Sequence, residues 1–318
     1  MSTRIDSLRS TRWGLAALVS LSLPLGTVLT GCGGGKDGTD TAHVTISEPS
    51  ATTSTAAVAA PAPSGTTPAA AKPAETTTST PPTASGGAEG WGTLKGRVIF
   101  GADKPPAPKV LVAKGDKTVK DGDVCAKQEI DSERLVVDAA SKGVRNVIVY
   151  IPKPTKVSPE AVSALKSAEV VFDQKNCRFV PHVLAAMKGQ TVQIKSSDPV
   201  GHNANAVGLN NNKFNLPTQP LSSMPYPLRG VDKPGKVGCD IHGWMEAYWL
   251  VLDNPYFAVT DAQGNFEIKN VPAGEQKVVV WAEAVGPGYV TAASGEPISI
   301  KAGGETAKDY TIDPAKVK

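Results

Sequence analysis

The sequence lacks a strong charge imbalance. Its 33 lysines and arginines nearly balance 30 aspartates and glutamates, which leaves a formal net charge of +3 over 318 residues. Binding to nucleic acid or to anionic lipid through charge alone depends on a clear excess of basic residues. We therefore expect no nucleic-acid partner, and no membrane attachment that relies on basic side chains.

The sequence also has no long run of apolar residues at helical spacing. The one helical candidate, Ser158 to Ala168, starts with a serine suited to an N-cap and a proline at the first helical position. From Trp91 onward, short β-branched runs such as Val147–Ile151 and Trp249–Leu252 alternate with turn residues. This pattern predicts an all-β sandwich fold with one short helix.

The first 31 residues have the composition of an export signal. Arg4, Arg9 and Arg12 precede a short apolar run that ends at Leu29-Thr-Gly-Cys32, which resembles the cleavage site of bacterial lipoproteins. The run is too short to span a membrane comfortably, and such signals are removed from the mature chain. We expect residues 1–31 to be cleaved and Cys32 to carry lipid. The chain would then be exported and lipid-anchored to a bacterial membrane, facing the periplasm or the cell exterior. An uncleaved anchor or cleavage elsewhere remains open.

Residues 32–90 contain mainly Ala, Thr, Pro, Ser and Gly, with hardly any large apolar side chains. Such a segment cannot bury enough surface to offset the entropy lost on ordering. We expect a disordered tether, which proline keeps semi-extended.

Three sulfur and nitrogen ligands lie close together near residue 240. Cys239, His242 and Met245 are each separated by two residues and directly precede an apolar strand. A blue copper site needs one thiolate, two imidazoles and a weak axial thioether. His202, at the far end of the strand-like segment that begins at Gly189, is our candidate for the second imidazole.

These residues resemble the cupredoxins, or blue copper proteins. The spacing of Cys239, His242 and Met245 is similar to that of amicyanin, and the segment with Asp198, His202 and Asn203 matches the family's first ligand region. The resemblance covers roughly residues 145–253, within a domain expected at 91–253 with an N-terminal β extension. It implies a Greek-key sandwich, one type 1 copper per chain, and the transfer of single electrons between a protein donor and a protein acceptor.

Further roles follow from the resemblance. Asn203 is expected to hold the ligand loops together by hydrogen bonds. His182 is expected to be a structural histidine or a neighbour of the ligands. The docking patch for redox partners is expected at an apolar rim formed by Trp244, Met224 and Tyr226. Four histidines are too few for the oxygen-reducing cluster of multicopper oxidases, so we expect no enzyme activity.

Two cysteines remain once Cys32 and Cys239 are assigned. Cys125 and Cys177 can pair, because leftover thiols in an oxidising compartment usually form a disulfide. Two buried free thiols are the alternative, and a bridge that used Cys239 would be incompatible with the copper site.

Residues 254–318 show a second pattern. Thr260-Asp-Ala-Gln-Gly-Asn-Phe266, followed by Val271-Pro-Ala-Gly274, resembles the carboxypeptidase regulatory-like, transthyretin-type sandwich. The segment is short for such a module, so strands near Gly96 could complete it, or the two halves could form one unit. That resemblance carries no function. Two alternatives to electron transfer remain: a structural or ligand-binding lipoprotein without redox chemistry, and a copper storage or delivery protein.

Overall fold

The computed structural model describes residues 90–318. The expected signal peptide, the lipidated Cys32 and almost all of the expected tether lie outside the described residues. Within 90–318 the chain forms 21 strands, two short α-helices and one 3₁₀ turn, so the predicted all-β fold class is confirmed. In this range no helix has both the length and the apolar character needed to cross a bilayer.

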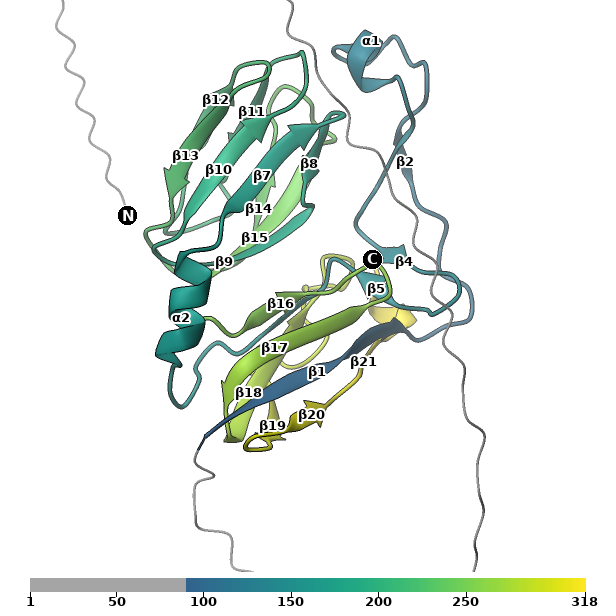
Figure 1. Cartoon of the computed structure of the whole chain (residues 1–318). Helices are drawn as coiled ribbons and strands as arrows, with labels where there is room; N and C mark the ends of the chain where they lie inside the picture. Colours follow the sequence, from purple (N-terminus) through teal and green to yellow (C-terminus); the bar gives the residue numbers. More distant parts are fainter. Residues whose placement is uncertain (1–89) are drawn as a thin grey trace, which may run out of the picture. The chain divides into compact units, whose positions relative to one another are not determined.

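A first sandwich consists of strands β7 to β15, between residues 170 and 252. One of its sheets contains, in spatial order, β13 (Ser223–Pro227), β10 (Thr191–Ser196), β7 (Val170–Lys175) and β8 (Arg178–Val180). The other contains β12 (Asn215–Thr218), β11 (His202–Asn205), β14 (Asp232–Gly238), β15 (Glu246–Leu252) and β9 (Val183–Met187). Figure 1 shows the two sheets facing each other.

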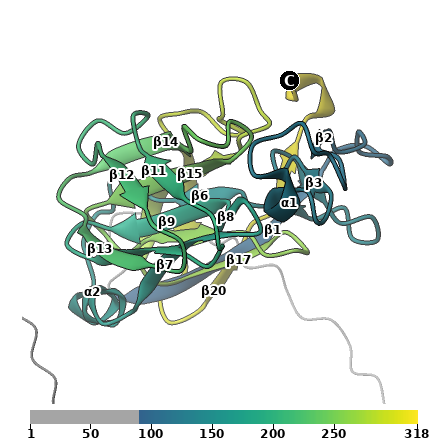
Figure 2. The ribbon, with the colours of Figure 1, turned by 90° about the horizontal axis from the view of Figure 1, so that it is seen from above.

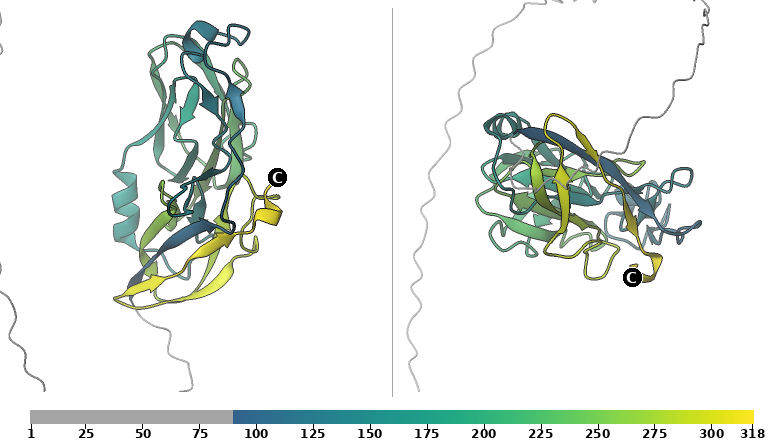
Figure 3. Two further views of the ribbon diagram at one scale, coloured as in Figure 1. Left: turned by 90° about the vertical axis from the view of Figure 1, so that its right-hand side faces the viewer. Right: turned by 90° about the horizontal axis from the view of Figure 1, so that it is seen from below.

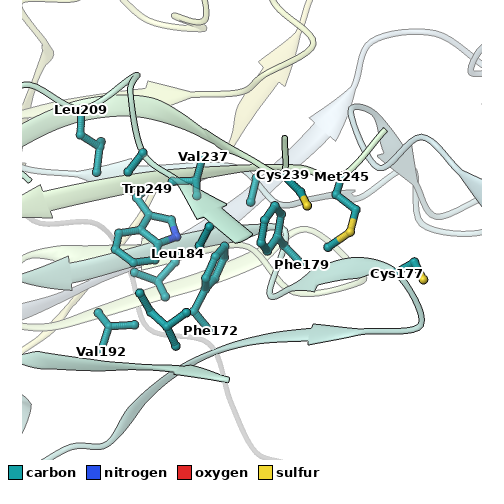
Figure 4. Packing of buried hydrophobic residues seen from close by; sticks show 14 of the residues in the cluster. Phe172, Cys177, Phe179, Leu184, Val192, Leu209, Val237, Cys239, Met245 and Trp249 are labelled. Atoms are coloured by element: carbon teal, nitrogen blue, oxygen red, sulfur yellow. The ribbon is translucent and has the colours of Figure 1, made fainter. Parts of the chain in front are cut away.

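Aromatic side chains fill the core of the first sandwich. Phe172 stacks on Phe179 with ring centroids 4.8 Å apart, and Trp249 meets the edge of Phe172 at 4.9 Å. Figure 4 shows these rings in the middle of the cluster, with the sulfur atoms of Cys239 and Met245 toward one end. Full burial of such rings supplies a large share of the hydrophobic stabilisation. The ligand candidates therefore lie at one end of a rigid, close-packed core.

A second sandwich combines strands from both ends of the described chain. One sheet contains β17 (Asn265–Pro272), β1 (Trp91–Phe100) and β20 (Glu305–Ala307), with β21 (Tyr310–Ile312) also paired to β1. The other contains β16 (Phe257–Val259), β6 (Ile148–Tyr150), β18 (Gly274–Trp281) and β19 (Glu296–Ile300). Figure 3 shows β1, in blue, beside the yellow strands of the C-terminal segment.

The pairing of β1 and β6 with C-terminal strands shows where the two sandwiches divide along the chain. The strand that contains Gly96 completes the sheets of residues 254–318, as one of the two arrangements considered from the sequence would have it. The strands near residue 145 also belong to the second sandwich, because β6 pairs with β16 and β18. The sandwich that carries the ligand candidates begins at β7 and not at residue 145.

Between β1 and the β4–β5 ribbon, residues 101–135 form a segment that we call the excursion. It contains β2 (Val110–Val112), α1 (Gly122–Cys125) and β3 (Ile130–Asp131), and it is followed by β4 (Val136–Val137) and β5 (Val144–Arg145). Cys125 of α1 forms a disulfide with Cys177, in the turn between β7 and β8. Figure 2 shows α1, β2 and β3 beside β8.

The expected short helix is confirmed as α2 (Pro159–Lys166). The Ser158 hydroxyl accepts a hydrogen bond from the Ala161 amide at 3.2 Å, and Pro159 occupies the first turn, where an amide proton is not needed.

A smaller apolar cluster joins the two sandwiches. It contains Leu250 and Leu252 of β15 together with Val279 and Trp281 of β18. The rings of Tyr248 and Trp281 lie 5.0 Å apart within it. We call this cluster the junction.

Candidate metal centre

The ligand loop connects β14 to β15. The amide of Cys239 donates to the carbonyl of Met245 at 3.2 Å, and the amide of Met245 donates to the carbonyl of His242 at 2.9 Å. These two bonds close the loop into a tight turn. Gly243 lies at its exposed tip, with open space where a β-carbon would stand. The loop therefore directs Cys239, His242 and Met245 into the molecule from a short stretch of backbone.

His202 reaches the same place from β11. This strand pairs with β12 along its length and meets β14 at Asn205 and Gly238, directly before the ligand loop. The His202 and His242 rings have centroids 4.7 Å apart, and both side chains are buried. Strand pairing, and not sequence proximity, brings the fourth candidate to the loop.

The potential ligand atoms converge on one point. The two Nδ1 atoms of His202 and His242 lie 3.0 Å apart, and Nδ1 of His242 lies 3.9 Å from Sγ of Cys239. One donor atom from each of the three residues falls within 4.8 Å of the others. Metal–imidazole bonds are about 2.0–2.1 Å and metal–thiolate bonds about 2.3 Å for an ion of the size of Zn²⁺. A single ion can therefore contact all three residues.

Each imidazole is held by a carboxylate on its other nitrogen. Nε2 of His202 lies 3.0 Å from Oδ2 of Asp198, and Nε2 of His242 lies 3.0 Å from Oδ2 of Asp121. Such partners orient a ligating ring and make it a better donor. Both rings consequently present Nδ1 to the centre.

Cys239 is prepared to be a thiolate. Burial raises the pKa of its thiol, but hydrogen bonds with His202 and His242 outweigh this effect and bring the pKa down to about 6. Burial lowers the pKa of His202, but its hydrogen bonds with Asp198 and Cys239 raise it to about 9. The same contacts thus favour the thiolate of Cys239 and the protonated form of His202.

Met245 is buried at the same end of the core as Cys239 (Figure 4). A thiolate and two imidazoles with a neighbouring thioether are the donors that copper prefers in trigonal sites. The residues present thus fit a copper ion. A second group, formed by Cys177, Asp198 and His202, does not, because the sulfur of Cys177 is engaged in the disulfide.

Asn203 links the two ligand segments. Its Oδ1 accepts from the Asp240 amide at 2.7 Å, and its Nδ2 donates to Asp240 Oδ2 at 2.8 Å. The same Oδ1 lies 3.3 Å from Sγ of Cys239. A side chain on β11 thus holds the start of the ligand loop.

His182 lies elsewhere. Its Nε2 is 2.6 Å from Oε2 of Glu283, and its backbone carbonyl accepts from Tyr248. His182 directly precedes β9, which pairs with β15 beyond the ligand loop. Its ring contacts Glu283 of the C-terminal segment and not the ligand candidates. It forms no part of the group of ligand atoms found in residues 90–318.

The three residues expected to form a docking patch have different surroundings. The ring of Trp244 lies 5.1 Å from that of His242, and its Nε1 donates to the Cys177 carbonyl at 3.1 Å. Trp244 lines a cleft of about 990 Å³, together with residues of the excursion. Met224 and Tyr226 lie on β13 and are not among the residues that line this cleft. Tyr226 packs instead against Phe214 at 4.4 Å.

Asp121 is the neighbour of the ligands that the sequence did not reveal. It stands 121 positions from His242, in a segment that reads as a turn. The one available signal was indirect: Cys125 follows four residues later, and its pairing with Cys177 would bring this segment to the first sandwich.

Comparisons with known proteins give distant likenesses. No family model matches the chain, and no curated protein matches it. Among solved structures, a copper-containing nitrite reductase from Thermus scotoductus is 18% identical over 31% of this chain and 27% of its own, with a TM-score of 0.26. A purple cupredoxin from Nitrosopumilus maritimus is 22% identical over 27% of this chain and 99% of its own, with a TM-score of 0.23. An amicyanin variant in the Cu(I) form is 17% identical over 32% and 97%, with a TM-score of 0.24.

Proposed function

We propose that this chain is a copper protein that carries single electrons between redox proteins outside the cytoplasm. Cys239, His202 and His242 would form the trigonal ligand set, and Met245 would be the weak axial ligand. Bound copper would alternate between Cu(II) and Cu(I). The observation that supports this most directly is the convergence of one sulfur and two Nδ1 atoms, with both Nε2 atoms held by carboxylates.

The surrounding protein suits such a role because it limits movement of the ligands. One backbone hydrogen bond joins Cys239 to Met245 and another joins Met245 to His242. His202 begins strand β11, which is paired with β12. Ligands held by strands and loops in a close-packed core change position little between two charge states of an ion. Burial of the ligand side chains also favours retention of the ion over rapid exchange, which is a reason to prefer a carrier to a delivery protein.

A visible absorption spectrum of the full chain with one equivalent of copper tests the proposal. A thiolate bound to Cu(II) should give an intense visible charge-transfer band. Cys239→Ser should abolish the band, and His202→Ala should weaken it or remove it with the metal. Asp123→Asn, which changes an exposed carboxylate that pairs with Lys117 and contacts no ligand candidate, is the control and should keep the band.

If the chain binds no copper at one equivalent, or binds it equally well after Cys239→Ser, the carrier proposal fails. A structural or ligand-binding lipoprotein would then be the better account. If copper binds and is released to a chelator within seconds, storage or delivery becomes the better account.

A further inference from the structure

The excursion packs into the first sandwich, although β1 before it belongs to the second and the β4–β5 ribbon after it packs on the core of the second. Val112, Cys125, Ala126 and Ile130 are buried in the same core cluster as Cys239 and Met245. The disulfide between Cys125 and Cys177 fixes it to the turn between β7 and β8. Figures 1 and 2 show α1 beside the end of this sandwich. Core packing and the disulfide therefore hold the excursion in place next to the candidate centre.

Asp121 is the residue of the excursion that contacts a ligand candidate, His242. It is the N-cap of α1, in the left-handed region at φ 55°, which few residues other than glycine adopt. Its carbonyl accepts from the amides of Val124 and Cys125, both at 2.9 Å, but its side chain makes no capping bond. Oδ2 is instead 3.0 Å from Nε2 of His242. The turn thus directs the carboxylate at the imidazole.

Burial of His242 is complete, with 0% of its side chain exposed, whereas the Asp121 side chain is 25% exposed. Nε2 of His242 is thus bonded to the Asp121 carboxylate, in the place that water or a partner protein would otherwise occupy. On its other side the ring packs against Trp244. Asp121 separates His242 from solvent.

The other half of the disulfide is connected to the second histidine. The amide of Cys177 donates to Oδ2 of Asp198 at 2.8 Å, and this oxygen lies 3.0 Å from Nε2 of His202. The Asn176 amide donates to the other carboxylate oxygen at 2.7 Å. The disulfide thus links the segment that contains Asp121 to the turn whose amides hold the carboxylate of Asp198.

We propose that the excursion is a covalently fixed cap on the outer ligand histidine, and that Asp121 is its positioning residue. Asp121 holds Nδ1 of His242 toward Cys239 and excludes solvent and partner proteins from Nε2. The edge of the His242 ring is then closed to redox partners. The part that concerns electron transfer rests on the proposed function, but the capping itself does not.

The capping is tested without metal by diethyl pyrocarbonate, which acylates accessible imidazole nitrogens, followed by peptide mass spectrometry of the full chain. His242 should be protected in the wild type and should become reactive in Asp121→Ala and in Cys125→Ala/Cys177→Ala. The matched control is Asp123→Ala, since Asp123 lies on the same helix but pairs with Lys117 at the surface. Far-UV circular dichroism verifies that each variant is folded. Asp121→Asn, which keeps the side chain's size and an acceptor, should remain largely protected.

The positioning role is tested with copper. Loss of a carboxylate behind a ligating imidazole typically costs about 10–100-fold in metal affinity, so Asp121→Ala should lose that much and Asp123→Ala nothing. Asp121→Asn should raise the reduction potential, because a negative charge beside the ring favours the more positive oxidised ion. A merely structural residue would leave the potential unchanged.

The outcomes separate the two proposals. If His242 in folded Asp121→Ala is as protected as in the wild type, the cap is overturned whatever copper does. If His242 becomes reactive but neither wild type nor variants bind copper, the cap is supported and the proposed function fails. If copper affinity and potential are the same in Asp121→Ala, Asp121→Asn and wild type, the positioning role is overturned.

Discussion

The two candidate imidazoles use their ring nitrogens for different purposes. Nδ1 of each ring faces Cys239, and Nε2 of each is bonded to a carboxylate, Asp198 for His202 and Asp121 for His242. In the metal-free chain their mutual hydrogen bonds raise the pKa of His202 and lower the pKa of Cys239, which favours a protonated imidazole and a thiolate. A cation that binds here displaces that proton, as metal binding to such ligands generally does. The contacts that favour the thiolate therefore also suit the binding of a cation.

Met245 offers the sharpest change at a single residue. We expect Met245→Leu to keep the visible band of the copper form and to raise the reduction potential, because the weak axial donor tunes the potential of such sites. Leucine has a similar volume, so the cost in stability should stay below about 1.5 kcal/mol. Voltammetry measures the potential, and Met224→Leu on β13 is the control. Equal potentials in Met245→Leu and wild type would contradict an axial role for the thioether.

At the scale of elements, the features that could be predicted were those that depend on residues close together in the sequence. The ligand loop could be identified because Cys239, His242 and Met245 follow one another at fixed spacing, and α2 because Ser158 and Pro159 mark its start. His202 was chosen because it lies at the far end of a strand-like segment, and the family pattern agrees with that choice. Local chemistry was sufficient for these elements.

The features that could not be predicted depend on pairing across long distances. That strands near Gly96 complete the C-terminal sandwich was one of two arrangements considered, but nothing near Trp91 indicates that the partner of β1 is β17, some 170 residues later. For the same reason Asp121 could not be connected to His242, nor His182 to Glu283. A turn sequence such as that around Asp121 describes the local backbone and contains no information on what its side chain meets.

The disulfide gives a prediction for the excursion. Cys125 and Cys177 enclose 52 positions of chain, for which the chain-entropy account gives about 4 kcal/mol of stabilisation. Cys125→Ala/Cys177→Ala should lower the free energy of unfolding of the first sandwich by up to that amount, as measured by urea denaturation. In the denatured, unreduced mature chain one thiol, that of Cys239, should titrate, because Cys32 is expected to carry lipid. Three titratable thiols would contradict the bridge.

At the scale of the whole molecule, the expected lipid attachment would decide where the protein works. Because Leu29-Thr-Gly-Cys32 resembles a lipoprotein cleavage site, we expect the mature chain to begin at a diacylated Cys32. Cys32→Ser should leave the precursor uncleaved and without lipid. Intact-mass spectrometry of the membrane and soluble fractions measures both. A mature chain that starts at another, unmodified residue would contradict this prediction.

The junction decides whether the two sandwiches unfold together. Trp281 of β18 is buried and packs against Tyr248 of β15, and the other side chains of this cluster also come from both sandwiches. A buried tryptophan replaced by alanine typically costs about 3–5 kcal/mol. Because Trp281 lies at the junction, Trp281→Ala should also weaken the coupling between the sandwiches.

We expect one thermal transition in the wild type, with the visible band of copper and the far-UV ellipticity lost together. In Trp281→Ala the two signals should separate. Trp91→Ala, which changes a half-buried residue of β1 packed on the second sandwich alone, should lower the transition temperature without separating them. Two transitions in the wild type would show that the junction does not couple the sandwiches.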